Sequence, residues 1–202
     1  MNKITLTAAL LVALALAACS KEETPSSSSS TSAPAAAATS QPVTTEAIEA
    51  GAQGFTVGSP MSARTVYVFY DAQCPHCSAL WYAAKPLKSQ AKFVWIPIRL
   101  LNDSSATQAA AILAAKDPVA AMDAHENSMM DHKGGIKPEG DVSAQLAVVK
   151  KNTELFNKFG FNSVPSLVTK NAQTGAITTH EGSMQTPDLA AFVGVQPPPP
   201  AQ

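Results

Sequence analysis

Residues 65–77 read TVYVFYDAQCPHC, and this stretch decides the fold that the sequence predicts. Its first part, 65–70, is β-branched and aromatic throughout, which is typical of a strand buried on both faces. A Cys-x-x-Cys motif follows at 74–77, where a helical pattern begins. The sequence therefore places two thiols one helical turn apart, at the point where a buried strand passes into a helix.

The sequence after the motif completes a strand–helix–strand unit. Apolar residues recur at three- and four-residue steps from Cys77 to Ala91, which predicts a helix with one buried face. Pro86 should kink this helix because it lacks the amide that the backbone ladder needs. Residues 92–98 (KFVWIPI) predict the next strand, and Pro97 favours an edge position or an early stop. A unit of this order is parallel and right-handed by default.

The rest of the domain adds helices and then a hairpin. A Cys-x-x-Cys pair beside a βαβ pattern indicates a thioredoxin-like redox motif. We therefore predict the α/β class, with a thioredoxin-like fold and an inserted helical region. The further helices are expected over 104–115 (capped by Ser104 or Ser105), 118–126 (capped by Asp117), 142–159 and 187–192 (capped by Thr186), and the further strands over 55–57, 166–169 and 176–180.

The spacing of the two cysteines predicts unequal chemistry. Cys74 should cap the helix and Pro75 should take its first position, where a missing amide costs nothing. The Cys74 sulfur then faces the free amides of His76 and Cys77 and the positive end of the helix dipole, which favour the thiolate. A protonated His76 would strengthen this effect. We expect Cys74 to attack and Cys77, one turn into the helix, to resolve the mixed disulfide.

Two alternatives for this pair are a metal site and a structural disulfide. A structural zinc site needs four ligands, and the sequence has no second Cys-x-x-Cys. A disulfide that closes so short a loop would stabilise the fold little. We therefore expect redox chemistry without a metal or a cofactor. In thioredoxin-like folds, a cis-proline just before a strand packs against the Cys-x-x-Cys motif. The dipeptide Val164-Pro165 has this place in the sequence, so its peptide bond is expected to be cis.

The two ends of the chain differ from the domain. Residues 1–18 combine a Lys, a short apolar run and small residues, which describes a signal peptide. The string Leu16-Ala17-Ala18-Cys19 resembles the lipobox of bacterial lipoproteins, which implies a lipid on Cys19. The Ser-, Ala- and Pro-rich sequence that follows predicts a flexible tether over 19–50. We expect the folded domain over 51–195 and a Pro-rich tail over 196–202.

Several linked motifs resemble the Dsb family of periplasmic thiol:disulfide interchange proteins, closest to the catalytic domain of the DsbG and DsbC branch. They are VYVFYDAQCPHCSALW, WIPIRLL with SSATQAAAILAAKDP, and NSVPSLV. The resemblance implies that Cys74 is the nucleophile, Cys77 the resolving thiol and Val164-Pro165 the cis-proline pair. Val164 and the Pro75-His76 dipeptide match the oxidase DsbA instead of that branch, so the direction of electron flow stays open.

The resemblance also implies partners and a location. We expect envelope proteins with cysteines or disulfides as substrates, a membrane redox partner of the DsbD or DsbB type, and a periplasmic domain that is lipid-anchored, to the outer membrane more than the inner. The tether stands where that branch has its dimerisation domain, so we expect a monomer or a weak dimer. A formal net charge of −1 gives no reason to expect nucleic-acid binding.

Three function classes follow from these features. The first is an exchange enzyme of the isomerase or reductase type, with a DsbA-like oxidase as its variant. The second is a copper carrier that would use Cys74 and Cys77 together with soft ligands from a nearby His and Met cluster. That cluster consists of His125, Met129, Met130 and His132. The third is a chaperone-like protein that would act without either cysteine.

Overall fold

The computed structural model describes residues 40–171 and 174–199. The predicted signal peptide 1–18 and Cys19 lie outside the described residues. The strands are β1 (Phe55–Gly58), β2 (Thr65–Asp71), β3 (Lys92–Ile98), β4 (Ser166–Lys170) and β5 (Ile177–Glu181). The helices are α1 (Thr45–Gly51), α2 (Pro75–Ala84), η1, a 3-10 turn (Lys85–Leu87), α3 (Asp103–Ala114), α4 (Pro118–Met130), α5 (Ser143–Lys158) and α6 (Thr186–Val193).

The strands form one mixed sheet in the order β1-β3-β2-β4-β5, with β2 at its centre. β2 pairs with β3 in parallel and with β4 antiparallel, so the predicted βαβ unit and the terminal hairpin are confirmed. The parallel register runs from Thr65 opposite Lys92 to Asp71 opposite Ile98. The carboxyl end of β2 therefore lies beside the carboxyl end of β3 and the start of β4.

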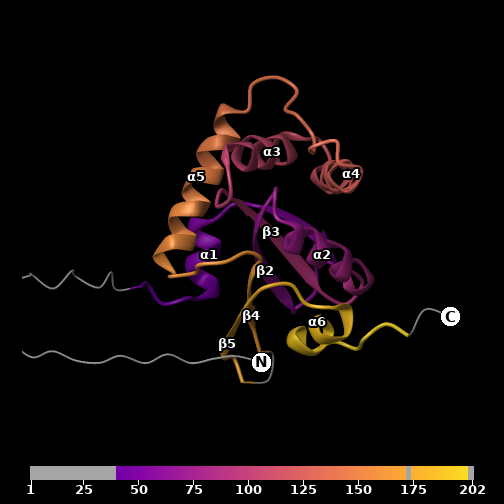
Figure 1. Cartoon of the computed structure of the whole chain (residues 1–202). Coiled ribbons are helices and arrows are strands. Elements are labelled where there is room, and N and C mark those ends of the chain that lie inside the picture. Colours follow the sequence, from indigo (N-terminus) through magenta and orange to yellow (C-terminus); the bar gives the residue numbers. More distant parts are fainter. Residues whose placement is uncertain (1–39, 172–173, 200–202) are drawn as a thin grey trace, which may run out of the picture. The chain divides into compact units, whose positions relative to one another are not determined.

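Helices cover both faces of the sheet, which explains why β2 is apolar at successive positions (Figure 1). α1 and α5 lie on one face, where Phe69 packs against Phe156, Phe159 and Phe161. α2 and α6 lie on the other face. An aromatic group fills the core on that side, with ring centroids 5.0–6.3 Å apart: Phe55, Tyr70, Trp81 and Trp95.

The predicted helical insertion is present as α3 and α4, followed by the long helix α5, between β3 and β4. Asp117 caps α4 as predicted and accepts from the amides of Val119 and Ala120. The expected cap of α3 was wrong. Asn102 is the cap, and Ser105 bonds back to the Asn102 amide in a capping box. α4 also continues to Met130, beyond its predicted end.

Other expectations are corrected by packing. Pro97 does not mark an edge, because β3 lies between β1 and β2 and continues to Ile98. β1 pairs only as far as Trp95, so the missing amide of Pro97 costs no ladder bond on that side. Pro86 does interrupt the helix, which becomes the 3-10 turn η1. Gln185, instead of Thr186, occupies the cap position of α6.

The tether predicted over 19–50 extended too far into the domain. Residues 45–51 form α1, with Thr44 as its cap. Ile48 is buried in the main core, and the Glu49 carboxylate accepts a hydrogen bond from the Tyr67 hydroxyl. At the other end, Gln196 exchanges two hydrogen bonds with the Gln90 side chain. No helix among the described residues has the length and apolarity to cross a bilayer.

Candidate active site

Cys74 is the N-cap residue of α2, in the extended conformation that a cap requires. Its Sγ accepts a hydrogen bond from the Cys77 amide at 3.4 Å, and Pro75 takes the first turn of the helix. Both cysteines are free thiols. Cys74 retains 7% of its surface and Cys77 retains none, so only the first sulfur has a route to solvent. His76 is exposed beside them.

The two thiols differ in acidity as well as in burial. The hydrogen bond from the Cys77 thiol, with help from the amides of Cys77 and His76, lowers the pKa of Cys74 to about 7 against the effect of burial. Burial raises the pKa of Cys77 well above its usual range, and the neighbouring Cys74 adds to the rise. At neutral pH a substantial part of Cys74 is therefore thiolate, whereas Cys77 stays protonated.

The Val164-Pro165 peptide bond is cis, as predicted, and it lies beside Cys74. The Val164 carbonyl oxygen lies 3.5 Å from Cys74 Sγ. The loop before it is held by Glu181 on β5, whose Oε2 accepts from the amides of Asn162 and Ser163 at 3.2 and 3.0 Å and from the Ser163 hydroxyl at 2.8 Å. The structure thus brings Val164 and Pro165 to the cysteine pair, and the sequence had not singled out Glu181.

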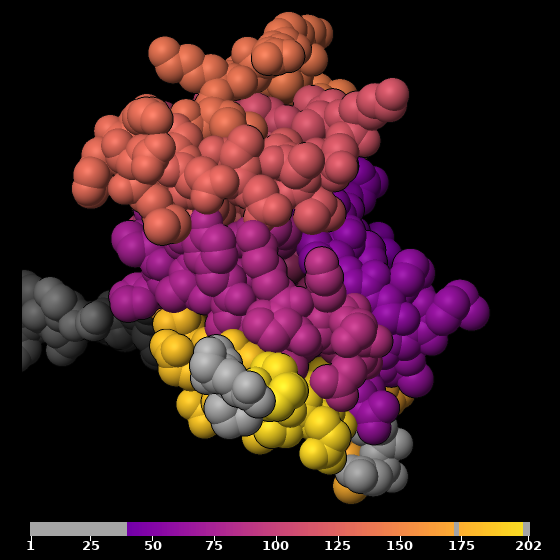
Figure 2. Space-filling model, turned by 90° about the vertical axis from the view of Figure 1, so that its right-hand side faces the viewer, coloured from indigo at the N-terminus to yellow at the C-terminus, as the bar shows by residue number. Residues whose placement is uncertain are grey.

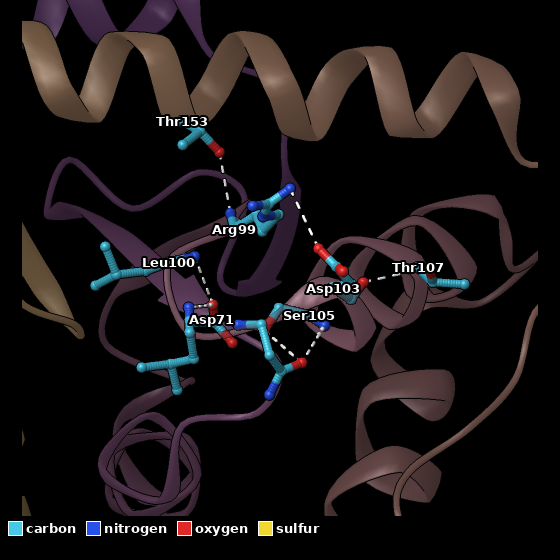
Figure 3. A network of polar contacts seen from close by, with 9 residues as sticks. Asp71, Arg99, Leu100, Asp103, Ser105, Thr107 and Thr153 are labelled. Carbon is cyan, nitrogen blue, oxygen red and sulfur yellow. Dashed lines mark hydrogen bonds and ion pairs between the residues drawn. The ribbon is translucent and has the colours of Figure 1, made fainter.

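Asp71 is a buried carboxylate at the end of β2, three residues before Cys74. One oxygen accepts from the Gln73 amide at 2.8 Å, and the other accepts from the amides of Leu100 and Leu101 at 2.7 and 2.9 Å. Figure 3 shows this carboxylate between the end of β2 and the loop after β3. Asp71 therefore fixes the turn that delivers Cys74, and its charge opposes ionisation of both thiols.

A cavity of about 330 Å³ opens beside Cys74. It lies between the start of α2 and the end of α4, and these two helices lie next to each other on the face shown in Figure 2. Burial raises the pKa of the Glu126 carboxyl in its wall to about 7. The other lining residues are the apolar Ala72, Pro75, Met129 and Met130 and the polar Gln73, Ser78 and His132.

The predicted soft-ligand cluster does not form as one site. Met129, Met130 and His132 line the cavity beside Cys74, but His125 is fully buried and is not part of that lining. Both of its ring nitrogens are hydrogen-bonded to backbone, to Ala72 O and Ile136 N. The described residues contain no group of three or more His, Cys, Asp or Glu side chains placed to hold a metal ion.

Sequence reasoning missed Asp71, although it was the one acidic residue at the end of an apolar strand. A charge at the end of a fully buried strand is rarely accommodated without several hydrogen bonds, and this is the signal that could have identified Asp71. Nothing local in the sequence distinguishes Glu181 from other charged residues of a hairpin, because its partners lie in a different segment of the chain.

The sheet, the helix-capping thiol and the facing cis-proline loop together define a thioredoxin-fold domain with a dithiol at the start of a helix. The sequence profile of the thioredoxin-like domain family matches residues 59–194, and the chain belongs to this family.

Curated relatives include two thiol:disulfide interchange proteins named DsbG. The protein from Pseudomonas aeruginosa is 31% identical over 136 residues, which cover 65% of this chain and 51% of the relative. The protein from Escherichia coli is 32% identical over 104 residues, which cover 50% and 42%. The chain thus spans about half the length, or less, of the curated relatives that it matches.

Among solved structures, the catalytic domain of Proteus mirabilis ScsC superposes with a TM-score of 0.56. The sequence identity is 19%, and the match covers 74% of this chain and 96% of that domain. This likeness confirms the thioredoxin-like fold that the sequence predicted.

The role of Asp71 can be tested with an Asp71→Asn substitution. The asparagine side chain keeps the shape of the aspartate, but its NH₂ group would face backbone amides that also donate. We therefore expect a loss of about 3 kcal/mol in the free energy of unfolding. Removal of the charge should also lower the pKa of Cys74. Chemical denaturation and the pH dependence of alkylation by iodoacetamide measure the two effects.

Asp103→Asn is the matched control for this substitution. Asp103 lies in the same network, but its 3.4 Å ion pair with Arg99 is exposed, with 97% and 58% of the two side chains accessible. Its replacement should change stability by about 0.5 kcal/mol or less. Equal effects of the two substitutions would contradict the role given to Asp71.

Proposed function

We propose that the protein is a thiol:disulfide oxidoreductase that works through Cys74 and Cys77. One observation carries this proposal: the Cys74 sulfur, with its pKa lowered to about 7, lies between the Cys77 amide and the Val164 carbonyl beside an open cavity. This placement gives a nucleophile at neutral pH with a second thiol one turn away. The DsbG relatives, which are named thiol:disulfide interchange proteins, support the same chemistry.

In the reducing direction, the Cys74 thiolate attacks one sulfur of a substrate disulfide. The substrate S–S bond breaks, the other substrate sulfur leaves as a thiolate, and a mixed disulfide forms on Cys74. Cys77 then gives up its proton and attacks Cys74 Sγ, which releases the second substrate thiolate. The two substrate thiolates take up one proton from Cys77 and one from solvent, which holds the proton that Cys74 lost on ionisation. The substrate has thus gained two electrons and two protons, and Cys74 and Cys77 are left as a disulfide. Oxidation of a substrate dithiol is the reverse sequence.

The names of the curated relatives favour interchange of the DsbG or DsbC type, that is, isomerisation or reduction. A DsbA-like oxidase is the alternative, because Pro75-His76 and Val164 match DsbA in the sequence. The stabilised thiolate of Cys74 favours the reduced form of the pair, which makes a dithiol a better oxidant. The copper-carrier alternative loses support because His125 has no free ring nitrogen.

We also propose that the domain acts in the periplasm as a monomer, held to the membrane by a lipid on Cys19, with the outer membrane as the favoured address. The lipobox-like string 16–19 supports the anchor. Its substrates would be envelope proteins with cysteines or disulfides. A membrane protein of the DsbD or DsbB type would then restore the redox state of the Cys74 and Cys77 pair.

The exchange chemistry predicts that a Cys77→Ala variant traps its substrate. With the resolving thiol removed, the Cys74 mixed disulfide with insulin should accumulate and be visible by non-reducing electrophoresis. The Cys77 thiol is the main cause of the low pKa of Cys74, so the rate of trapping should rise with pH to a midpoint above about 7. Cys74→Ala is the control and should trap nothing. Trapping by both variants, or by neither, would contradict the proposed roles.

The anchor predicts that the full-length chain, expressed in a bacterium with a labelled fatty acid, takes up the label and fractionates with membranes. Cys19→Ser should abolish both labelling and membrane retention while the exchange activity persists. A labelled Cys19→Ser variant, or an unlabelled natural sequence, would rule the anchor out.

A further inference from the structure

The two residues that precede Cys74 are held by side chains of the helical insertion. His125 on α4 places its Nε2 atom 2.7 Å from the carbonyl oxygen of Ala72. The Gln73 side-chain amide donates to Oε1 of Gln108 on α3. Gln108 in turn donates from Nε2 to the carbonyl oxygen of Gly134, at 2.6 Å. The turn that carries the reactive thiol is thus fastened to α3, α4 and the loop after α4.

The contacts of His125 define a single protonation state of its ring. The Ile136 amide donates to Nδ1 at 3.3 Å, and a backbone amide can only donate. Nδ1 must therefore be the unprotonated nitrogen. Nε2 carries the hydrogen and donates it to Ala72 O, so the imidazole is neutral and both nitrogens are used.

The ring is also enclosed, because the loop after α4 packs directly on it. His125 has no exposed surface. A Cβ atom at Gly135, where φ is +85°, would lie 2.6 Å from Cε1 of His125 and 2.7 Å from Nε2 of Gln108. Only a glycine fits both the backbone conformation and the space at this position. The close packing on this side leaves no room for a water molecule to accept a new hydrogen from the ring.

We propose that His125 is a positioning residue that fixes the Cys74 turn through Ala72 while its imidazole is neutral, and that releases the turn when the imidazole takes up a proton. The inference rests on the proposed thiol chemistry of Cys74. A proton on Nδ1 would point one donor at another, the Ile136 amide, inside a closed site. The ring can keep that proton only if the loop or the turn moves away.

The surroundings of His125 indicate the direction in which pH acts. Burial lowers the pKa of His125, and the hydrogen bond to Ala72 only partly opposes it. The His125 ring therefore binds a proton less readily in the native state than in the unfolded chain. The hydrogen bond from His125 to Ala72 is complete above the ordinary histidine pKa and is lost as the pH falls through the native pKa of His125. The ionisable groups on the turn 71–74, α3, α4 and the loop 131–142 are, besides His125 itself, Asp71, Cys74, Asp103, Asp123, Glu126, Asp131, His132, Lys133, Lys137, Glu139 and Asp141.

The test is the alkylation rate of Cys74 by iodoacetamide in the reduced full-length protein, followed from neutral to acidic pH. A single titrating thiol loses about tenfold in rate per pH unit below its pKa. The natural protein should fall more steeply where His125 takes up its proton. His125→Gln can keep a donor to Ala72 O without a titrating ring, so it should keep the neutral rate and show the single-thiol slope. His125→Leu, which lacks the donor, should lose about fivefold in rate at neutral pH.

His180→Gln is the matched control, because His180 lies on the edge strand β5 and its ring makes an edge contact with Phe192 of α6. It should keep the steep profile. A profile with the single-thiol slope in the natural protein, or one that is flattened by His76→Gln or His132→Gln instead of His125→Gln, would overturn the inference. The inference would also be overturned if Cys74 is alkylated and the pH profile of His125→Gln equals that of the natural protein. The proposed function would stand in that case. A Cys74 that neither alkylates nor forms mixed disulfides would instead reject the proposed function.

A second measurement needs no substitution at His125. Imidazole nitrogen shifts of the ¹⁵N-labelled natural protein should show a neutral ring at neutral pH, with the proton on Nε2. A proton on Nδ1, or a charged ring at neutral pH, would overturn the proposal even if the variants failed to fold.

Discussion

The structure depends on one constraint, which is that the Cys74 sulfur must lie at the start of α2 and face the start of β4 at once. The Cys77 amide approaches the sulfur from the helix, and the Val164 carbonyl approaches it from the loop before β4. Both contacts require β2 to end beside β4, which is why β2 occupies the centre of the sheet. Two carboxylates hold these segments in place. Asp71 accepts hydrogen bonds from backbone amides of the loop after β3, and Glu181 accepts others from the cis-proline loop. Aromatic side chains pack around this frame on both faces of the sheet.

The same geometry makes the two thiols unequal. Cys74 receives hydrogen bonds that stabilise its charge, whereas Cys77 lies within the packed face of α2, where burial favours the neutral thiol. In a dithiol of this kind one sulfur can attack as the thiolate, while the other stays protonated until the mixed disulfide has formed. The helical insertion contributes the cavity wall beside Cys74 and, through His125 and Gln108, the support for the turn before it.

Much of this could be predicted from the sequence, because the features are local. The strand at 65–70, the capping position of Cys74 and the strand at 92–98 follow from residue type and spacing. The cis bond at Val164-Pro165 followed from the place at which thioredoxin-like folds carry a cis-proline. The failures are not local. A single buried residue, Ile48, gives no apolar pattern from which α1 could be predicted. So short a helix is stable only because it packs on the domain. Pro97 was misleading because its cost depends on where the neighbouring strand β1 ends. His125 looked like a metal ligand because sequence cannot show that backbone groups occupy both of its nitrogens.

The central claim is that Cys74 and Cys77 form a reversible redox couple instead of a metal site or a structural link. The most direct test is the reduction potential of this pair, measured by equilibration in glutathione buffers. The account predicts a defined two-electron couple between the values of thioredoxin, about −270 mV, and DsbA, about −120 mV. A potential below about −300 mV, which is typical of structural disulfides, or the absence of any disulfide between the two cysteines, would contradict it.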